Sequence, residues 1–179
     1  MSRSIIPNTI TCCNLICGCI ATGAAFEGGY LTAFVFILLG AFFDFFDGLV
    51  ARSLGVSGKF GVQLDSLADV VTFGVAPSAM LFSLFTQVYY PEFMYSKFWF
   101  TVMPFTAFLV AAFSACRLAK FNIDERQTTS FIGLATPANA IFWLGMAYGY
   151  QSLLEAISPW WILAAVLLFF ESHHIFAHG

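Results

Sequence analysis

The chain has 179 residues, of which 60% are hydrophobic, 18% are aromatic and only 9% are charged. A soluble domain carries about 25% charged residues, so this composition excludes an ordinary water-soluble protein and indicates a surface that faces lipid. The formal net charge of −3 gives no electrostatic reason to expect a nucleic-acid partner, and the length suggests one domain over residues 1–179.

Six segments are apolar over roughly the 20 residues that a helix needs to cross a bilayer. In chain order they run from about Thr9 to Phe26, Tyr30 to Leu54, Phe60 to Tyr89, Phe98 to Phe121, Phe131 to Leu154, and onward from Pro159. This pattern predicts an all-α membrane protein with six transmembrane helices.

The two ends of the chain carry further expectations. Pro7 and Asn8 precede the first predicted helix as a start signal, with Asn8 or Thr9 as its N-cap. The sixth segment is the shortest, and it is followed by a tail, residues 171–179, that we expect to be either poorly ordered or a shortened end.

The basic residues predict the orientation in the membrane. With the helices numbered alternately from a cytosolic N-terminus, the inside segments carry Arg3, Arg52, Lys59, Arg117, Lys120 and Arg126. The outside segments carry only Lys97 among basic residues, together with Glu27, Glu92 and Glu155. Cytoplasmic loops of membrane proteins are enriched in Lys and Arg, so both termini are expected in the cytosol.

Four aspartates lie close together inside this apolar chain. Asp44 and Asp47 fall within the second predicted helix, and Asp65 and Asp69 fall near the start of the third. A charged residue in the bilayer core costs about 3 kcal/mol or more, so such residues usually face a polar cavity and mark function. Structural ion pairing is the alternative, but few basic residues are close enough in sequence to neutralise four carboxylates.

Helical spacing gathers these aspartates into rows. At about 100° per residue, side chains four residues apart lie above one another on a helix. The rows are Asp44, Gly48 and Arg52, then Asp47 and Ala51, and on the next helix Gly61, Asp65 and Asp69. Gly55 and Gly58 suit a tight turn between the two helices. We therefore expect an antiparallel hairpin whose rows face one cavity at the cytosolic end.

The residue types predict the chemistry of this cavity. Carboxylates without His or Cys suit a hard cation, Mg²⁺ or Mn²⁺, rather than zinc. Two divalent cations would balance four aspartates, and paired ions about 3.5–4 Å apart recur in phosphoryl-transfer enzymes. Gly48, Ala51 and Gly61 leave room for a substrate, and Arg52 supplies a cation for a phosphate.

A divalent-cation transporter is a rival interpretation from a different class of protein. Intramembrane aspartates would then line an ion path across the bilayer. Such a path needs polar residues that continue to the outer face, and the segment LTAFVFILLGAFF (31–43) offers almost none.

The spacing D-x-x-D-G-x-x-A-R-x8-G-x3-D-x3-D resembles the signature of the CDP-alcohol phosphotransferase family. The resemblance implies transfer of a substituted phosphate from a CDP-linked donor to an alcohol, with release of CMP, by a homodimer of six-helix subunits. It implies that Asp44, Asp47, Asp65 and Asp69 bind the metals, and that Asp69 is also the general base on the acceptor hydroxyl. By the same resemblance, the nucleotide site is lined by Gly48, Ala51, Arg52 and Gly61.

The flanking sequence is most similar to the phosphatidylserine synthase branch of this family. The similarity is carried by IPNTITCCNLICG (6–18), SGKFGVQLDSLADVVTFGVAPS (57–78), CRLAKFN (116–122) and FIGLATPANA (131–140). It implies CDP-diacylglycerol or CDP-archaeol as donor and L-serine as acceptor. One departure is Ala135, where many relatives have Pro, and it does not touch the aspartates. Glycerol phosphate and inositol phosphate remain alternative acceptors, although a phosphorylated acceptor should require a denser basic pocket.

Further candidates concern the two substrates. The serine carboxylate needs a cation, so Arg117 is the first acceptor candidate and Lys120 the next, with Asn122 as a polar partner. Lys59 is a further candidate, as a contact for the head group or the lipid phosphate. Anchoring by the positive-inside rule explains these basic residues equally well. Asn8, Thr11 and Asn14 could reach the nucleotide phosphates, with Asn8 also a candidate helix cap.

Overall fold

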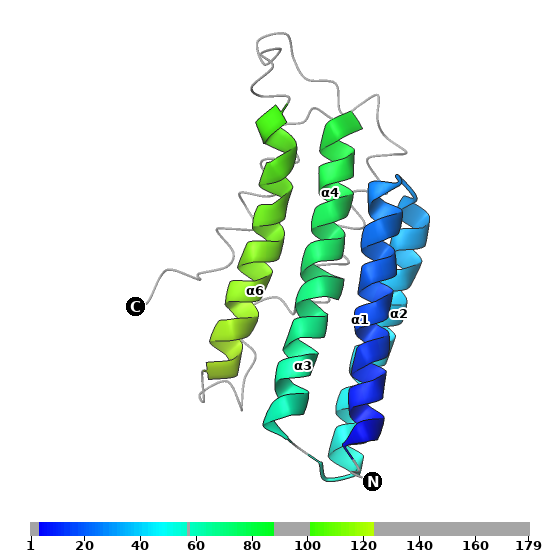
Figure 1. The fold of residues 1–179 in the computed structure, drawn as a ribbon, viewed down its shortest axis with the longest axis vertical. Coiled ribbons are helices and arrows are strands. Elements are labelled where there is room, and N and C mark those ends of the chain that lie inside the picture. The colour runs from blue at the N-terminus through cyan, green and yellow to red at the C-terminus, as the bar shows by residue number, and fades with distance from the viewer. Residues whose placement is uncertain (1–3, 57, 88–100, 124–179) are drawn as a thin grey trace.

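The computed structural model describes residues 4–56, 58–87 and 101–123, and their regular structure is helical throughout (Figure 1). The elements are α1 (Ile5–Phe26), α2 (Tyr30–Ser53), α3 (Lys59–Asp69), η1 (Val70–Val75), α4 (Ala76–Gln87), η3 (Met103–Ala107) and α6 (Phe108–Ile123). α3, η1 and α4 follow one another without a break and form one long helix. The fifth and sixth predicted spans and the tail lie outside the described residues.

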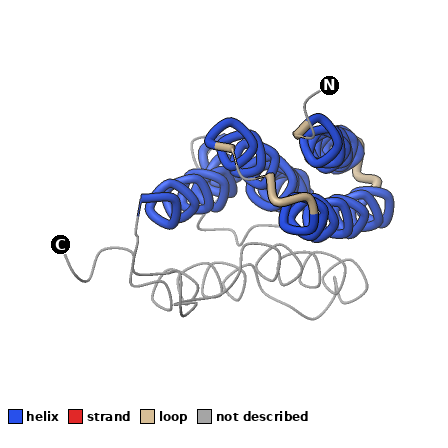
Figure 2. Tube along the Cα trace, turned by 90° about the horizontal axis from the view of Figure 1, so that it is seen from below, coloured by secondary structure: helices blue, strands red, loops and turns tan. Residues whose placement is uncertain are grey.

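Four stretches of helix are long and apolar enough to cross a membrane. They are Ile5–Phe26, Tyr30–Ser53, Lys59–Gln87 and Met103–Lys120. Successive stretches run in opposite directions, and Figure 2 shows their axes lying side by side. This confirms the first four predicted spans and the all-helical membrane class.

α1 begins one turn earlier than the sequence predicts. It starts at Ile5, with Ser4 in the N-cap position, and no side chain caps it. Pro7 lies in the first turn, where its missing N–H has no partner to lose. The prediction that Asn8 or Thr9 is the N-cap is therefore wrong. The backbone N–H of Asn8 donates to the Ser4 carbonyl oxygen at 3.3 Å, and its side chain is left for another role.

α1 lies at the centre of the packing. It contacts α2 along its length and also contacts α3, η1 and α4, whereas α2 and α3 make few direct contacts. Small residues allow this close approach, as is common between membrane helices. A Cβ added at Gly18 of α1 would lie 2.8 Å from the Cα of Thr72 in η1. The two helices that carry the aspartates are thus held in place largely through α1.

A π-helical turn follows the last aspartate directly. η1 spans Val70–Val75, and π-helical turns of this kind are frequent at functional sites. The Thr72 hydroxyl donates to the backbone carbonyl oxygen of Asn14 at 3.1 Å. On the other side, a Cβ added at Gly74 would lie 3.3 Å from the Cβ of Ser114 in α6. The π-helical turn therefore sits tightly between α1 and α6.

The end of the bundle where α1 meets α2 is closed by polar side chains that bond to one another. The Tyr30 hydroxyl donates to Ser83 Oγ at 3.1 Å, and Gln87 Nε2 donates to the Tyr30 hydroxyl at 3.0 Å. Gly28 makes the connecting turn with a φ of +78°, a conformation that favours glycine. We call this the closed end.

Candidate active site

Three of the four aspartates form a tight group. One carboxylate oxygen from each of Asp44, Asp47 and Asp65 lies within 4.8 Å of the others. Asp47 is only 5% exposed, and Asp44 and Asp65 are partly buried. The predicted convergence of the two helical rows is therefore confirmed for Asp44, Asp47 and Asp65, although α1 rather than direct packing holds the two helices together.

Asp69 lies one turn further into the bundle than Asp65. Its carboxyl group neighbours that of Asp44 but does not belong to the group of three. The side chain of Asn14 reaches it from α1, and Asn14 Nδ2 donates to Asp69 Oδ1 at 3.3 Å. The fourth carboxylate thus has a different environment from the other three.

α1 contacts a carboxylate of each aspartate-bearing helix. Thr11 Oγ1 donates to Asp47 Oδ2 at 2.5 Å, and Asn14 of the next turn contacts Asp69. Sequence reasoning singled out Thr11 and Asn14 as possible phosphate contacts and missed this role. The available signal was the spacing of polar residues along one face of an otherwise apolar helix.

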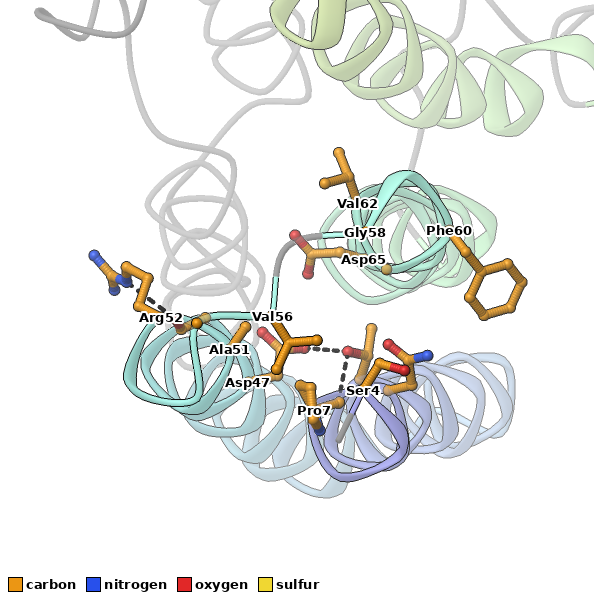
Figure 3. Close-up of a pocket in the computed structure, with 15 residues that line it drawn as sticks. Ser4, Pro7, Asp47, Ala51, Arg52, Val56, Gly58, Phe60, Val62 and Asp65 are labelled. Atoms are coloured by element: carbon orange, nitrogen blue, oxygen red, sulfur yellow. Dashed lines mark hydrogen bonds between the residues drawn. The ribbon is translucent and has the colours of Figure 1, made fainter. Parts of the chain in front are cut away.

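A pocket of about 700 Å³ opens beside these carboxylates, between the start of α1, the end of α2 and the start of α3 (Figure 3). Its size lies in the range of small-molecule sites. Its walls are formed by Ser4, Pro7, Asn8, Thr11, Asp47, Gly48, Ala51, Arg52, Gly55, Val56, Gly58, Phe60, Gly61, Val62 and Asp65. We call this end of the bundle the pocket end.

Most of the predicted nucleotide-binding residues lie on this wall, namely Asn8, Thr11, Gly48, Ala51, Arg52 and Gly61, whereas Asn14 does not. α1 approaches α3 closely here, since a Cβ at Gly61 would lie 3.3 Å from Asn8 Oδ1. The Nε of Arg52 donates to the Gly48 carbonyl oxygen at 3.0 Å, at the exposed edge of the pocket. The contacts of these residues with a nucleotide stay a prediction.

Within the described residues, no ion pair joins these carboxylates to Arg52 or Lys59. Asp65 Oδ1 is buried and accepts no hydrogen bond from the described residues. Buried polar atoms nearly always have partners, so an oxygen left bare within a group of carboxylates indicates a place for a cation. Because all the donors are oxygens, the residues fit Mg²⁺ or Mn²⁺.

The acceptor candidates lie at the pocket end without entering the described pocket wall. Arg117 and Lys120 are in the last turns of α6, which ends at the same end of the bundle as the pocket (Figure 1). Arg117 is partly buried, and Lys120 and Lys59 are exposed. Asn122 is in the final turn, but its side chain lies outside the described part. A cation for the serine carboxylate therefore stays a prediction.

The fold and the site together, a bundle of apolar helices with carboxylates grouped beside a pocket, indicate a membrane enzyme. The chain matches the family model for CDP-alcohol phosphatidyltransferases over residues 4–171, and it belongs to this family. The family resemblance seen in the aspartate spacing is therefore confirmed.

Curated relatives narrow the comparison. A CDP-diacylglycerol–serine O-phosphatidyltransferase of Bacillus subtilis is 37% identical over 156 residues, covering 85% of this chain and 80% of the relative. An enzyme of the same name from Methanocaldococcus jannaschii is 34% identical over 83% of this chain and 63% of its own length. The enzyme of that name from Saccharomyces cerevisiae is 40% identical, over 65% of this chain and 41% of the relative. No solved structure gives a significant match.

Proposed function

We propose that this protein transfers the phosphatidyl group of CDP-diacylglycerol to the hydroxyl of L-serine and releases CMP. CDP-archaeol takes the place of the donor where the membrane is built from isoprenoid lipids. The observation that carries the proposal is the group of aspartates, of which Asp47 and Asp65 line a pocket. The same wall holds Asn8, Gly48, Ala51, Arg52 and Gly61. The names of the relatives from Bacillus and Methanocaldococcus support serine as the acceptor.

In the proposed reaction, the serine hydroxyl oxygen attacks the phosphorus that carries the diacylglycerol. A new P–O bond forms, and the bond to the CMP oxygen breaks, so that CMP leaves with the electron pair. Asp69 accepts the hydroxyl proton, because a base must reach the acceptor oxygen. Its carboxyl group lies beside that of Asp44 but outside the group of three, which supports this additional role.

The remaining pocket residues bind and orient the donor. Gly48, Ala51 and Gly61 make room for the nucleotide, and Asn8 and Arg52 lie where polar groups of CDP can be bound. Asp44, Asp47 and Asp65, with Asp69, would hold two divalent cations, Mg²⁺ or Mn²⁺. Such cations supply positive charge that stabilises the phosphate oxygens and the leaving group.

The pocket end is proposed to face the cytosol, where serine and CTP-derived nucleotides occur. All the Lys and Arg residues within the described ranges, Arg52, Lys59, Arg117 and Lys120, lie at this end (Figure 1). Cytoplasmic loops carry such an excess of basic residues. We also propose that two copies of the chain form a homodimer, as the family resemblance implies.

An acceptor screen tests the proposal. Purified protein in detergent is incubated with CDP-diacylglycerol and Mn²⁺, and with serine, glycerol phosphate or inositol phosphate in separate reactions. We expect CMP release and a new serine-containing lipid, identified by mass spectrometry, with serine alone. CMP release with glycerol phosphate but not with serine would overturn the choice of acceptor.

A liposome flux assay separates the enzyme from the rival cation transporter. Beyond the aspartates the core is apolar, with Ile37, Phe73 and Met80 buried between the pocket end and the closed end. We therefore expect no Mn²⁺ uptake into liposomes that contain the protein. Uptake that depends on Asp65, without CMP release, would favour the transporter.

A further inference from the structure

We propose that Asn14 is a positioning residue that orients the Asp69 carboxylate for proton transfer. This inference rests on the proposed function, in which Asp69 acts as the base. Asn14 is fully buried, and its Nδ2 donates to Asp69 Oδ1. The bond holds Oδ1 from the side of α1, and the same carboxyl group also neighbours that of Asp44.

Two contacts tie Asn14 to the segment that carries the base. Its side chain holds Asp69, and its backbone carbonyl oxygen accepts the Thr72 hydroxyl at 3.1 Å. Thr72 is itself fully buried, one turn beyond Asp69 in the π-helical turn. The position of the carboxylate is thus fixed relative to α1 at two places.

Close packing limits the movement of the Asn14 amide. A Cβ added at Gly40 of α2 would lie 2.9 Å from Asn14 Oδ1 and would also collide with Thr72 Cγ2. The amide therefore lies between α2 and η1 with little room to turn. A second helix, in addition to α1, determines which way the Nδ2 group points.

The chemistry of an amide suits a residue that orients a base. A neutral donor holds the carboxylate without neutralising it, whereas Lys or Arg would form an ion pair and weaken the base. Asn14 Oδ1 is buried and has no hydrogen-bond partner. A buried acceptor without a partner costs about 1–3 kcal/mol, so an apolar residue of the same size would serve packing alone at least as well.

The experiment compares Asn14→Leu with Thr11→Val. Thr11 contacts Asp47 in the group of three carboxylates, whereas Asn14 contacts only the carboxylate outside it. Two quantities are measured for each variant: kcat and KM for CMP release, and Mn²⁺ affinity without substrates by electron paramagnetic resonance. Changes around a catalytic centre of this kind typically cost about 10–100-fold in activity or metal affinity.

The expected results differ between the two variants. Asn14→Leu should lower kcat about 10–100-fold, while KM for the donor and the affinity for the first Mn²⁺ change less than about threefold. Thr11→Val should weaken the first Mn²⁺ about tenfold. In an Asp69→Asn background, Asn14→Leu should lower turnover no further, because both changes act through one carboxylate.

Control and conservative variants keep the inference falsifiable. Thr22→Val removes a hydroxyl that donates to the Gly18 carbonyl oxygen of the same helix, and it should behave like the wild type. If Asn14→Leu fails to fold, Thr72→Val is used instead. This variant keeps the Asn14 side chain, removes only the hydrogen bond from Thr72 to the Asn14 carbonyl oxygen and should lower kcat. Thr72→Ser keeps the hydroxyl and should have a kcat close to that of the wild type.

Wild-type kcat in Asn14→Leu, an additional loss in the Asp69→Asn background, or a weakened first Mn²⁺ would each overturn the inference. Failure of the proposed function is recognised in the wild type, by the acceptor screen. If the wild type releases CMP only with another acceptor, serine is overturned and the Asn14 comparison is made with that acceptor. If no acceptor supports CMP release, both proposals fall.

Discussion

The two ends of the helix bundle use polar side chains in opposite ways. At the closed end, the Tyr30 hydroxyl donates to Ser83 Oγ, and Gln87 Nε2 donates to both Tyr30 and Ser83. At the pocket end, carboxylates lie together without an ion pair to Arg52 or Lys59, and Asp65 Oδ1 and Asn14 Oδ1 are buried without hydrogen-bond partners among the described residues. The closed end thus joins its polar groups to one another, whereas under the proposed function the pocket end uses its polar groups to bind ligands.

This difference indicates that the closed end contributes mainly to stability and the pocket end mainly to function. Polar groups that satisfy one another lower the free energy of the folded chain by about 0.5–1.5 kcal/mol per hydrogen bond. Carboxylates that crowd together oppose folding until a cation binds. Changes at the pocket end should therefore affect turnover and ligand response, and changes at the closed end should affect stability alone.

The largest effect is expected from Asp69→Asn at the pocket end. Asparagine keeps the shape of the side chain but cannot accept the serine proton, so CMP release should fall about 10³-fold, within the usual range for a general base. Binding of the CDP-linked donor, measured by isothermal titration, should be largely retained. Unchanged turnover would remove Asp69 as the base.

The next largest effect is the response of the wild type to Mn²⁺. A ligand at about 100 times its Kd stabilises the folded state by about 2.7 kcal/mol, so the melting temperature in detergent should rise on Mn²⁺ addition. The rise should be much smaller in Asp47→Asn, which loses one of the three grouped carboxylates. NaCl at matched ionic strength is the control, and an equal rise with NaCl would contradict a specific metal site.

A third effect concerns the contact between α1 and the π-helical turn. Gly18→Ala would place a Cβ 2.8 Å from the Thr72 Cα and should destabilise the protein by about 1–3 kcal/mol, seen as a lower melting temperature. Gly23→Ala is the matched control on the same helix, since its Cβ would meet nothing within 4 Å. Equal melting temperatures for the two variants would show that this close approach is not required.

The smallest effect is expected at the closed end. Gln87→Leu removes the donor to the Tyr30 hydroxyl and should lower stability by about 1 kcal/mol, while CMP release stays at the wild-type rate. Melting temperature and turnover are measured on the same preparation. A large loss of turnover would show that the two ends do not divide the roles as described.

The sequence predicts the helices well, because long apolar runs leave few alternatives to spanning helices. The observed start of α1 differs from the predicted one because a proline can lie either in the first turn of a helix or just before the helix. Here Pro7 lies in the first turn. The aspartates were found because helical period alone places them in rows. The spacing of Thr11 and Asn14 places them on one face of α1, but which carboxylates they contact depends on how α1 packs against two other helices.

The π-helical turn was also beyond sequence reasoning. The segment VVTFGV (70–75) contains no local signal for it, and its position follows from contacts with α1 and α6. The expected cations for serine, Arg117 and Lys120, lie near the end of α6 at the pocket end of the bundle but are not part of the described pocket wall. Their part in binding depends on tertiary arrangement that one sequence does not specify.

The π-helical turn between α3 and α4 affects how the sequence of this helix can vary during evolution. A π-helical turn holds one more residue per hydrogen-bonded ring than an α-helix, so it resets the angular relation between the residues before and after it. The aspartate row of α3 and the packing face of α4 therefore do not share one helical period. Each half of the helix can vary its sequence under its own constraint, chemistry in the first half and helix contacts in the second.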